Sequence, residues 1–253
     1  MTGKTMCQGC RDGQDVGFDF TMAFQPIVDV VAGRVWGYEA LVRGMQGQPA
    51  GEILALVDGT NRYAFDQACR VKAIDLASTL FPADGDCMLS INFMPNAVYE
   101  PSACIRATLA AARRTGFDTR RLMFEFTEDE RISDTAHLEN IINAYRRLGF
   151  TTALDDFGAG YAGLALLAKF QPDLIKLDME LIRGIATSPA RQAIVASLAG
   201  LARQLDIQVI AEGVETEAEL TVLRSAGLRL FQGYLFARPS LARLPELEFD
   251  LAA

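Results

Sequence analysis

The sequence predicts an α/β fold, a (β/α)8 barrel with an irregular start. Eight strand-like apolar runs recur along the chain, helical periodicity occupies the intervals between them, and 253 residues suffice for one barrel domain. From the third run onward the order is strand then helix, which implies parallel strands. The rival is an open doubly wound sheet, but no glycine-rich phosphate loop follows an early strand to support it.

The predicted strands are short apolar runs. They cover residues 21–28, 34–41, 87–92, 122–126, 151–154, 174–177, 208–211 and 229–231. Only residues 29–33 separate the first two runs, which is too few for a crossover helix. We therefore expect these two strands to form an antiparallel hairpin.

Two of the intervening helices have clear signals. Apolar residues at helical spacing predict a helix with Leu138, Ile141, Ile142, Tyr145 and Leu148 on one face. Gly149 is expected to end that helix. Thr216 and Glu219 have the spacing of a capping box, which predicts that a further helix begins at Thr216, ahead of Leu220 and Leu223.

The first residues of the chain differ in composition from the rest. Residues 1–18 read as a polar, poorly ordered leader, and residues 19–253 as one domain. Cys7 and Cys10 form a CxxC pair in the leader, which is either half of a metal or redox site or part of an unstructured tail or tag remnant. Cys69, Cys87 and Cys104 are expected to be buried thiols.

Composition excludes several functions. A net charge of −8 argues against binding a nucleic-acid polymer, which needs clustered Lys and Arg. The single histidine, His137, excludes a zinc site built on several imidazoles, and a Ser-His-Asp triad would have to use that residue. No run reaches the roughly 18 apolar residues of a membrane span, so no membrane association is expected and the cytoplasm is the expected compartment.

Oxygen-bearing or charged side chains stand at the end of one predicted strand after another. They are Glu39, Asn92, Glu125, Glu128, Asp155, Asp156, Lys176, Asp178, Glu212, Glu215 and Gln232. At any single position a solvated strand end explains such a residue equally well. For the set it does not, because Glu125 and Asp155 interrupt apolar strands, where a carboxylate needs strong compensation. In a barrel all of them meet at one mouth, where active sites lie.

Several carboxylates with one amide and no thiolate form a site for hard cations such as Mg²⁺ or Mn²⁺. Asp155 and Asp156 are adjacent, so each could serve one of two ions, or one could bridge both. Two such ions can bind a phosphodiester and activate a water. Lys176 would add a point charge; the alternative, a Schiff-base lysine, is disfavoured because neighbouring carboxylates keep the amine protonated.

At these residues the chain resembles the EAL-domain family of cyclic di-GMP phosphodiesterases. The eponymous tripeptide is Glu39-Ala40-Leu41, with Phe24-Gln25-Pro26-Ile27 before it and Arg43 after it. The family's other signatures follow in order as Ser90-Ile91-Asn92, Phe124-Glu125-Phe126-Thr127-Glu128, Asp155-Asp156-Phe157-Gly158, Ile175-Lys176-Leu177-Asp178, Ala211-Glu212-Gly213-Val214-Glu215-Thr216 and Phe231-Gln232-Gly233-Tyr234. The resemblance implies that residues 19–253 are an EAL phosphodiesterase domain with a modified TIM-like barrel and an antiparallel first strand pair.

The resemblance also implies hydrolysis of cyclic di-GMP to linear pGpG, with two Mg²⁺ or Mn²⁺ ions per site. Inhibition by Ca²⁺ is expected from its looser and larger coordination shell. It implies metal ligands at Glu39, Asn92, Glu125, Asp155, Asp156 and Glu212. Catalysis would rest on Lys176, Glu212 and Glu39, with Lys176 positioning the attacking water and Glu212 the candidate general base. Substrate would be contacted by Gln25, Arg43 and Asp178, and the site supported from behind by Glu128, Glu215 and Gln232.

One segment departs from the family pattern. After Asp156 the chain reads Phe157-Gly158-Ala159-Gly160-Tyr161-Ala162-Gly163, where family members usually carry more hydroxyl side chains. Lost hydrogen bonds of about 1 kcal/mol each would change how this loop couples to a partner, while Asp155 and Asp156 remain. The resemblance implies a homodimer through this loop and the following helix. The alternative function is a degenerate domain that binds cyclic di-GMP, or another protein, without hydrolysis.

Overall fold

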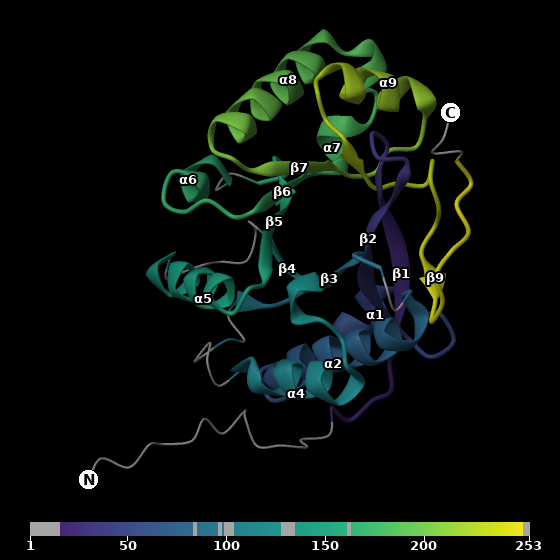
Figure 1. The fold of residues 1–253 in the computed structure, drawn as a ribbon, viewed down its shortest axis with the longest axis vertical. Coiled ribbons are helices and arrows are strands. Elements are labelled where there is room, and N and C mark those ends of the chain that lie inside the picture. Colours follow the sequence, from purple (N-terminus) through teal and green to yellow (C-terminus); the bar gives the residue numbers. More distant parts are fainter. Residues whose placement is uncertain are drawn as a thin grey trace.

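A closed ring of eight strands forms the centre of the chain (Figure 1). The structure is a computed structural model that describes residues 16–82, 85–95, 98, 104–127, 135–160 and 163–249. The strands are β1 (Thr21–Asp29), β2 (Arg34–Arg43), β3 (Met88–Asn92), β4 (Leu122–Thr127), β5 (Thr151–Phe157), β6 (Leu174–Leu177), β7 (Gln208–Ala211), β8 (Leu230–Phe231) and β9 (Ser240–Leu241). Strands β2 to β8 run parallel in chain order, and β1 closes the ring antiparallel to both β2 and β8. The predicted barrel and its antiparallel hairpin are confirmed.

β9 was not predicted. It pairs with β1 beside Ala23 and Phe24. The pairing is possible because β8 reaches β1 only at Val28 and Asp29, so the other end of the long first strand would otherwise have a free edge. A short strand that covers an edge removes its unpaired backbone groups from solvent.

Helices surround the ring in the described part of the chain (Figure 1). They are α1 (Ala50–Leu54), α2 (Arg62–Leu80), α4 (Arg106–Thr115), α5 (Thr135–Arg147), α6 (Gly163–Leu167), α7 (Met179–Ile182), α8 (Pro189–Gln204) and α9 (Glu217–Ser225), with 3-10 turns η3 (Thr119–Arg121) and η4 (Ile185–Thr187). Helices α2 and α4 lie side by side on one flank, and α8 and α9 on the opposite flank.

The two helices with clear sequence signals are present. In α5 the predicted face includes Leu138, Ile141, Ile142 and Tyr145, all of which are buried. Leu148 was placed on the same face, but it lies past the end of the helix at Arg147 and is 42% exposed. Gly149 follows with a left-handed φ of 83° and stops the helix. Thr216 and Glu219 form the predicted capping box of α9.

Buried Arg70 of α2 links α2 to α5 and to the end of β3. Its guanidinium pairs with the carboxylate of Asp66 and donates to the Tyr145 hydroxyl on α5 at 3.0 Å. The other Asp66 oxygen accepts the backbone N–H of Met94 at 2.9 Å. Because Met94 lies two residues past Asn92, this network holds the end of β3 in place.

The hairpin turn is anchored by Asp29. Its Oδ1 accepts the N–H groups of Val31 and Ala32 at 3.1 and 3.0 Å, and Arg229 Nη2 lies 2.6 Å from its Oδ2. Burial opposes ionisation, but the hydrogen bonds from Arg229 and the backbone hold the pKa of Asp29 below its usual 3.8. The turn is thereby tied to the residue before β8, where the ring closes.

Replacing Asp29 with Asn is expected to lower the free energy of unfolding by about 0.5–1 kcal/mol near neutral pH. The amide oxygen can still accept both N–H groups, so the lost free energy of unfolding measures the contribution of the negative charge of Asp29. Because the folded pKa is depressed, this contribution is present above about pH 3.9 and is lost as the pH falls through the folded value. Urea unfolding of both proteins from pH 6 to pH 2 measures it; a difference that grows in acid would contradict the assignment.

Among the described residues, no helix is long and apolar enough to cross a membrane. Cys69, Cys87 and Cys104 are buried free thiols, as predicted. Cys7 and Cys10 lie outside the described residues, and so does most of the predicted leader. Within that leader, Val16 and Phe18 already pack against the core.

Candidate active site

The barrel interior has an apolar layer and a polar layer. The apolar layer consists of Ile27, Met123, Ala153, Leu174, Ile210 and Leu230. The polar side chains stand two residues from these: Gln25, Glu125, Asp155 and Lys176 on the same strands, and Glu212 and Gln232 directly after the ends of β7 and β8. Because side chains alternate with a period of two, both sets point inward, one layer above the other. The apolar layer closes the bottom of the barrel, and the polar layer opens at the carboxyl ends of the parallel strands.

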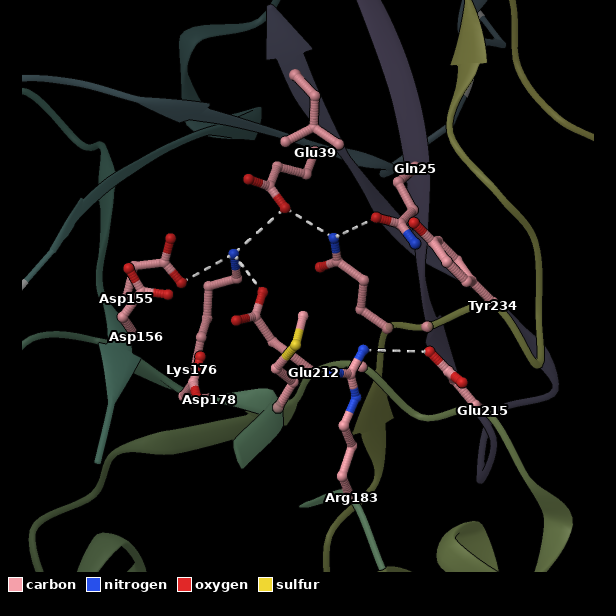
Figure 2. A pocket seen from close by; sticks show the side chains of 15 residues that line it. Gln25, Glu39, Asp155, Asp156, Lys176, Asp178, Arg183, Glu212, Glu215 and Tyr234 are labelled. Atoms are coloured by element: carbon pink, nitrogen blue, oxygen red, sulfur yellow. Dashed lines mark hydrogen bonds and ion pairs between the residues drawn. The ribbon is translucent and has the colours of Figure 1, made fainter. Parts of the chain in front are cut away.

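Lys176 is the centre of the polar layer. The side chain is 1% exposed, and its Nζ lies 2.8 Å from Glu125 Oε2 and 2.7 Å from Glu212 Oε1. The same nitrogen lies 3.1 Å from Asp155 Oδ1 and 3.3 Å from Glu39 Oε2 (Figure 2). One ammonium thus faces four carboxylates that come from four different strands or strand ends.

Neutral donors fix the orientation of these carboxylates. Asn92 Nδ2 donates to Glu39 Oε1 at 2.7 Å, and Gln232 Nε2 donates to Glu39 Oε2 at 2.7 Å. The Gln232 amide also donates to Gln25 Oε1 at 3.2 Å. On the other side, the Ser90 hydroxyl donates to Glu125. Glu39 and Glu125 are therefore held by hydrogen bonds from neutral side chains before any ligand enters.

Burial and crowding perturb the acids. Burial, with repulsion from Glu39, raises the pKa of Glu125 well above its usual value, and burial does the same for Glu212. Burial also raises the pKa of Asp155. Although burial opposes it, the surrounding carboxylates raise the pKa of Lys176 well above 10.5, so the amine stays charged. Added positive charge would stabilise the ionised acids.

Asp156 reaches the same mouth through a backbone irregularity. Strict alternation would turn it away from Asp155, but the strand register shifts between Leu154 and Phe157 and Asp156 has a φ of 54°. Burial and repulsion from Asp155 raise the pKa of Asp156 to about 6. Two adjacent carboxylates therefore line one cavity.

The donor set fits divalent cations. Two groups of carboxylates, Glu39 with Glu125 and Asp155, and Asp155 with Asp156 and Glu212, each offer oxygen atoms within 4.8 Å of one another. Asp155 is common to both. Its Oδ1 is buried and has no hydrogen-bond partner in the described part of the chain, although Lys176 is near. A buried anionic oxygen without a hydrogen bond, in an all-oxygen set, suits Mg²⁺ or Mn²⁺.

Some of the remaining predicted residues line the cavity and others do not. A cavity of about 270 Å³ above Lys176 is lined by Gln25, Asp178, Glu215 and Gln232 among others. Asp178 also caps α7 by accepting the N–H of Glu180 at 2.8 Å. Arg43 does not line this cavity; its guanidinium donates to the carbonyl oxygen of Val42. Glu128 lies outside the described residues, so its predicted support of the loop stays a prediction.

Sequence reasoning assigned no role to three residues that the structure brings to the site. Ser90 contacts Glu125, and its strand position two residues before Asn92 could have placed it inward. Tyr234 and Arg183 line the cavity (Figure 2). Tyr234 was part of a recognised motif, but Arg183 lies six residues past β6 and had no signal.

Comparison with known proteins agrees with this geometry. The family model described as "EAL domain" matches residues 15–239. A standalone EAL protein from Vibrio cholerae O395, solved with c-di-GMP bound, is 50% identical with a TM-score of 0.89, covering 93% of this chain and 98% of that one. A manganese and c-di-GMP complex of BlrP1 from Klebsiella pneumoniae is 40% identical with a TM-score of 0.83, covering 94% and 59%.

Curated relatives differ in their named functions. The antirepressor BluF of Escherichia coli is 35% identical over 89% of this chain and 55% of its own length. The cyclic di-GMP phosphodiesterase PA2567 of Pseudomonas aeruginosa is 32% identical over 95% and 41%. The chain thus spans about half the length of these relatives. From the barrel, the acidic mouth and the match over residues 15–239, the chain belongs to the EAL domain family.

Proposed function

We propose that the chain hydrolyses one phosphodiester bond of cyclic di-GMP to give linear pGpG. The observation that carries the proposal is the convergence of four buried carboxylates on Lys176, with Asp155 shared between two groups of oxygen donors. The similarity to a named phosphodiesterase and to structures that hold this dinucleotide supports it. In the reaction a water oxygen bonds to phosphorus, the P–O3′ bond breaks, and the leaving oxygen gains a proton.

Divalent ions would be held by Glu39, Asn92, Glu125 and Asp155 at one position, and by Asp155, Asp156 and Glu212 at the other. When bound, such ions supply a water of lowered pKa and neutralise charge on the phosphate. The manganese complex of the Klebsiella pneumoniae relative supports the choice of divalent metal.

The chain's own residues perform the remaining steps. Lys176 stays protonated and offers its charge to the phosphate oxygens as they gain charge in the transition state. Glu212 lines the cavity and, as a carboxylate, can accept the proton of the attacking water. Glu39 is held by Asn92 and Gln232, so its carboxylate cannot turn away from the reacting group. Gln25 and Asp178 offer an amide and a carboxylate to the nucleotide.

The alternative is a domain that binds cyclic di-GMP or a protein without hydrolysis, since one relative is named an antirepressor. Incubation with cyclic di-GMP and Mg²⁺ or Mn²⁺, followed by chromatography, separates the two. Accumulating pGpG supports the enzyme. Intact dinucleotide despite saturable binding would replace it with the receptor.

Calcium is expected to support binding and to block hydrolysis. Its larger and looser coordination shell holds attacking and leaving oxygens poorly for in-line displacement. Titration with fluorescent cyclic di-GMP in Ca²⁺ should show saturation, while chromatography of the same mixture shows no pGpG. A Ca²⁺ rate near the Mn²⁺ rate would refute this expectation.

A homodimer through the loop after Asp156 and helix α6 is also proposed. Leu164 of α6 is 59% exposed, so a charge introduced there would meet any partner surface that covers this helix. Tyr161 and Ala162 of the loop lie outside the described residues. Light scattering of the wild-type chain and of Leu164→Glu tests the proposal: the wild type should be dimeric and the variant monomeric.

A further inference from the structure

Among the described residues that line the cavity, Arg183 at its rim is the exposed cation. Of the described residues that line it, Lys176 and Arg183 carry positive charge, and Lys176 is enclosed by carboxylates. Arg183 is 59% exposed, and its Nη2 lies 3.5 Å from Glu215 Oε1, an ion pair visible at the rim (Figure 2). Arg183 therefore offers a positive charge at the rim to a dinucleotide whose two phosphates approach this acidic mouth.

Arg183 and Glu215 stand on separate segments that Glu219 joins. Glu219 Oε1 accepts the N–H of Gly184, the residue after Arg183, at 3.1 Å. Its Oε2 accepts the N–H groups of Glu215 and Thr216, each at 3.1 Å. Glu219 is 7% exposed, so this carboxylate is a fixed bridge between the end of α7 and the loop before α9.

The same two segments are in tight contact nearer the metal ligands. Gly213, the residue after Glu212, approaches α7 so closely that a Cβ on it would lie 2.5 Å from the Met179 Cβ. Gly184 has a φ of 70°, which turns the chain directly after Arg183 toward Glu219. The backbone on both sides of Arg183 is therefore held, and only its side chain is free to change partner.

We propose that Arg183 captures the anionic dinucleotide at the rim by exchanging its pairing with Glu215 for a substrate phosphate, and that Glu219 positions Arg183 through Gly184. This inference rests on the proposed substrate but not on its hydrolysis. Arg183 would act on binding, because the atoms that react lie deeper, beside Lys176. Glu219 is a positioning residue, since its carboxylate accepts the N–H groups of Gly184, Glu215 and Thr216 and does not line the cavity.

The test compares four variants for KM and kcat in Mn²⁺, and for dissociation of fluorescent cyclic di-GMP in Ca²⁺. Arg183→Gln should raise KM and Kd about tenfold and change kcat less than about twofold, the scale for losing one hydrogen bond to a charged group. Its control, Arg203→Gln on α8, removes the same charge outside the cavity and should leave both constants unchanged. Raising the salt concentration should weaken binding more in the wild type than in Arg183→Gln.

Glu219→Gln keeps one oxygen for the capping box and loses the bridge to Gly184, so KM should rise about threefold with kcat unchanged. Its control, Thr216→Ala, removes the cap hydroxyl and lowers the melting temperature but should leave KM unchanged. If Arg183→Gln behaves like Arg203→Gln, the capture role is overturned. If Glu219→Gln and Thr216→Ala have the same KM, the positioning role is overturned. If the wild type binds cyclic di-GMP but does not hydrolyse it, only the proposed enzymatic activity is refuted. The Kd of each variant relative to wild type then still tests the roles of Arg183 and Glu219.

Discussion

Replacing Asp155 with Asn is expected to lower kcat for cyclic di-GMP by at least about a hundredfold, the scale for losing one preorganised charged group. Asp155 belongs to both groups of carboxylates that can hold a cation, so the change weakens both positions at once. The amide keeps the size of the side chain, and the strand around it is packed, so folding should survive. The rate in saturating Mn²⁺, measured as pGpG formed, checks the expectation.

Asp156→Asn is the matched comparison for that experiment. Asp156 belongs to one of the two groups, and it is less buried than Asp155. Its loss should cost less activity and raise the Mn²⁺ concentration needed for half-maximal rate. Equal rates for Asp155→Asn and the wild type, with both folded, would show that the shared carboxylate holds no cation needed for turnover.

Lys176→Met should also lower kcat by at least about a hundredfold while cyclic di-GMP still binds. The variant leaves Glu39, Glu125, Asp155 and Glu212 facing one another without the ammonium that contacts all four. In metal-free buffer their mutual repulsion should lower the melting temperature. Divalent ions should then restore more stability than they add to the wild type, because binding to the folded state alone stabilises it.

Thermal melts with and without Mn²⁺, together with the turnover assay, test this expectation. Lys72→Met on α2 is the control, because it makes the same chemical change at an exposed position and should alter neither measurement. A folded Lys176→Met protein with a rate within about threefold of wild type would remove the lysine from the mechanism. A protein that stays unfolded even in saturating Mn²⁺ would instead make Lys176 a structural residue.

The acidic centre was predictable because a strand has a two-residue period and a barrel has one open mouth. Once strands such as 122–126 and 174–177 were identified, Glu125 and Lys176 had to face the interior near their carboxyl ends. The short link over residues 29–33 likewise required an antiparallel hairpin, and the structure has one. These predictions follow from local chain geometry, because the spacing of apolar and polar residues and the length of a connection can be read from the sequence.

Other features depended on contacts between distant segments. The alternation rule would have turned Asp156 outward, and the register shift with its left-handed backbone turned it into the mouth. Leu148 fitted the helical period but lies past the end of its helix. Strand β9 forms only because the free edge of β1 is there to receive it.

The sequence alone determined the eight strands of the ring, which of their residues face inward, and that those residues form an acidic mouth. Only the tertiary structure decided which side chains complete that mouth. Arg183 and Glu215 lie 32 positions apart in the numbering, and they share the rim because Glu219 joins their backbones by hydrogen bonds. Which side chains of a strand face inward follows from its neighbouring residues in the sequence. Which loop residues meet at the rim depends on how distant segments come together when the ring of strands closes.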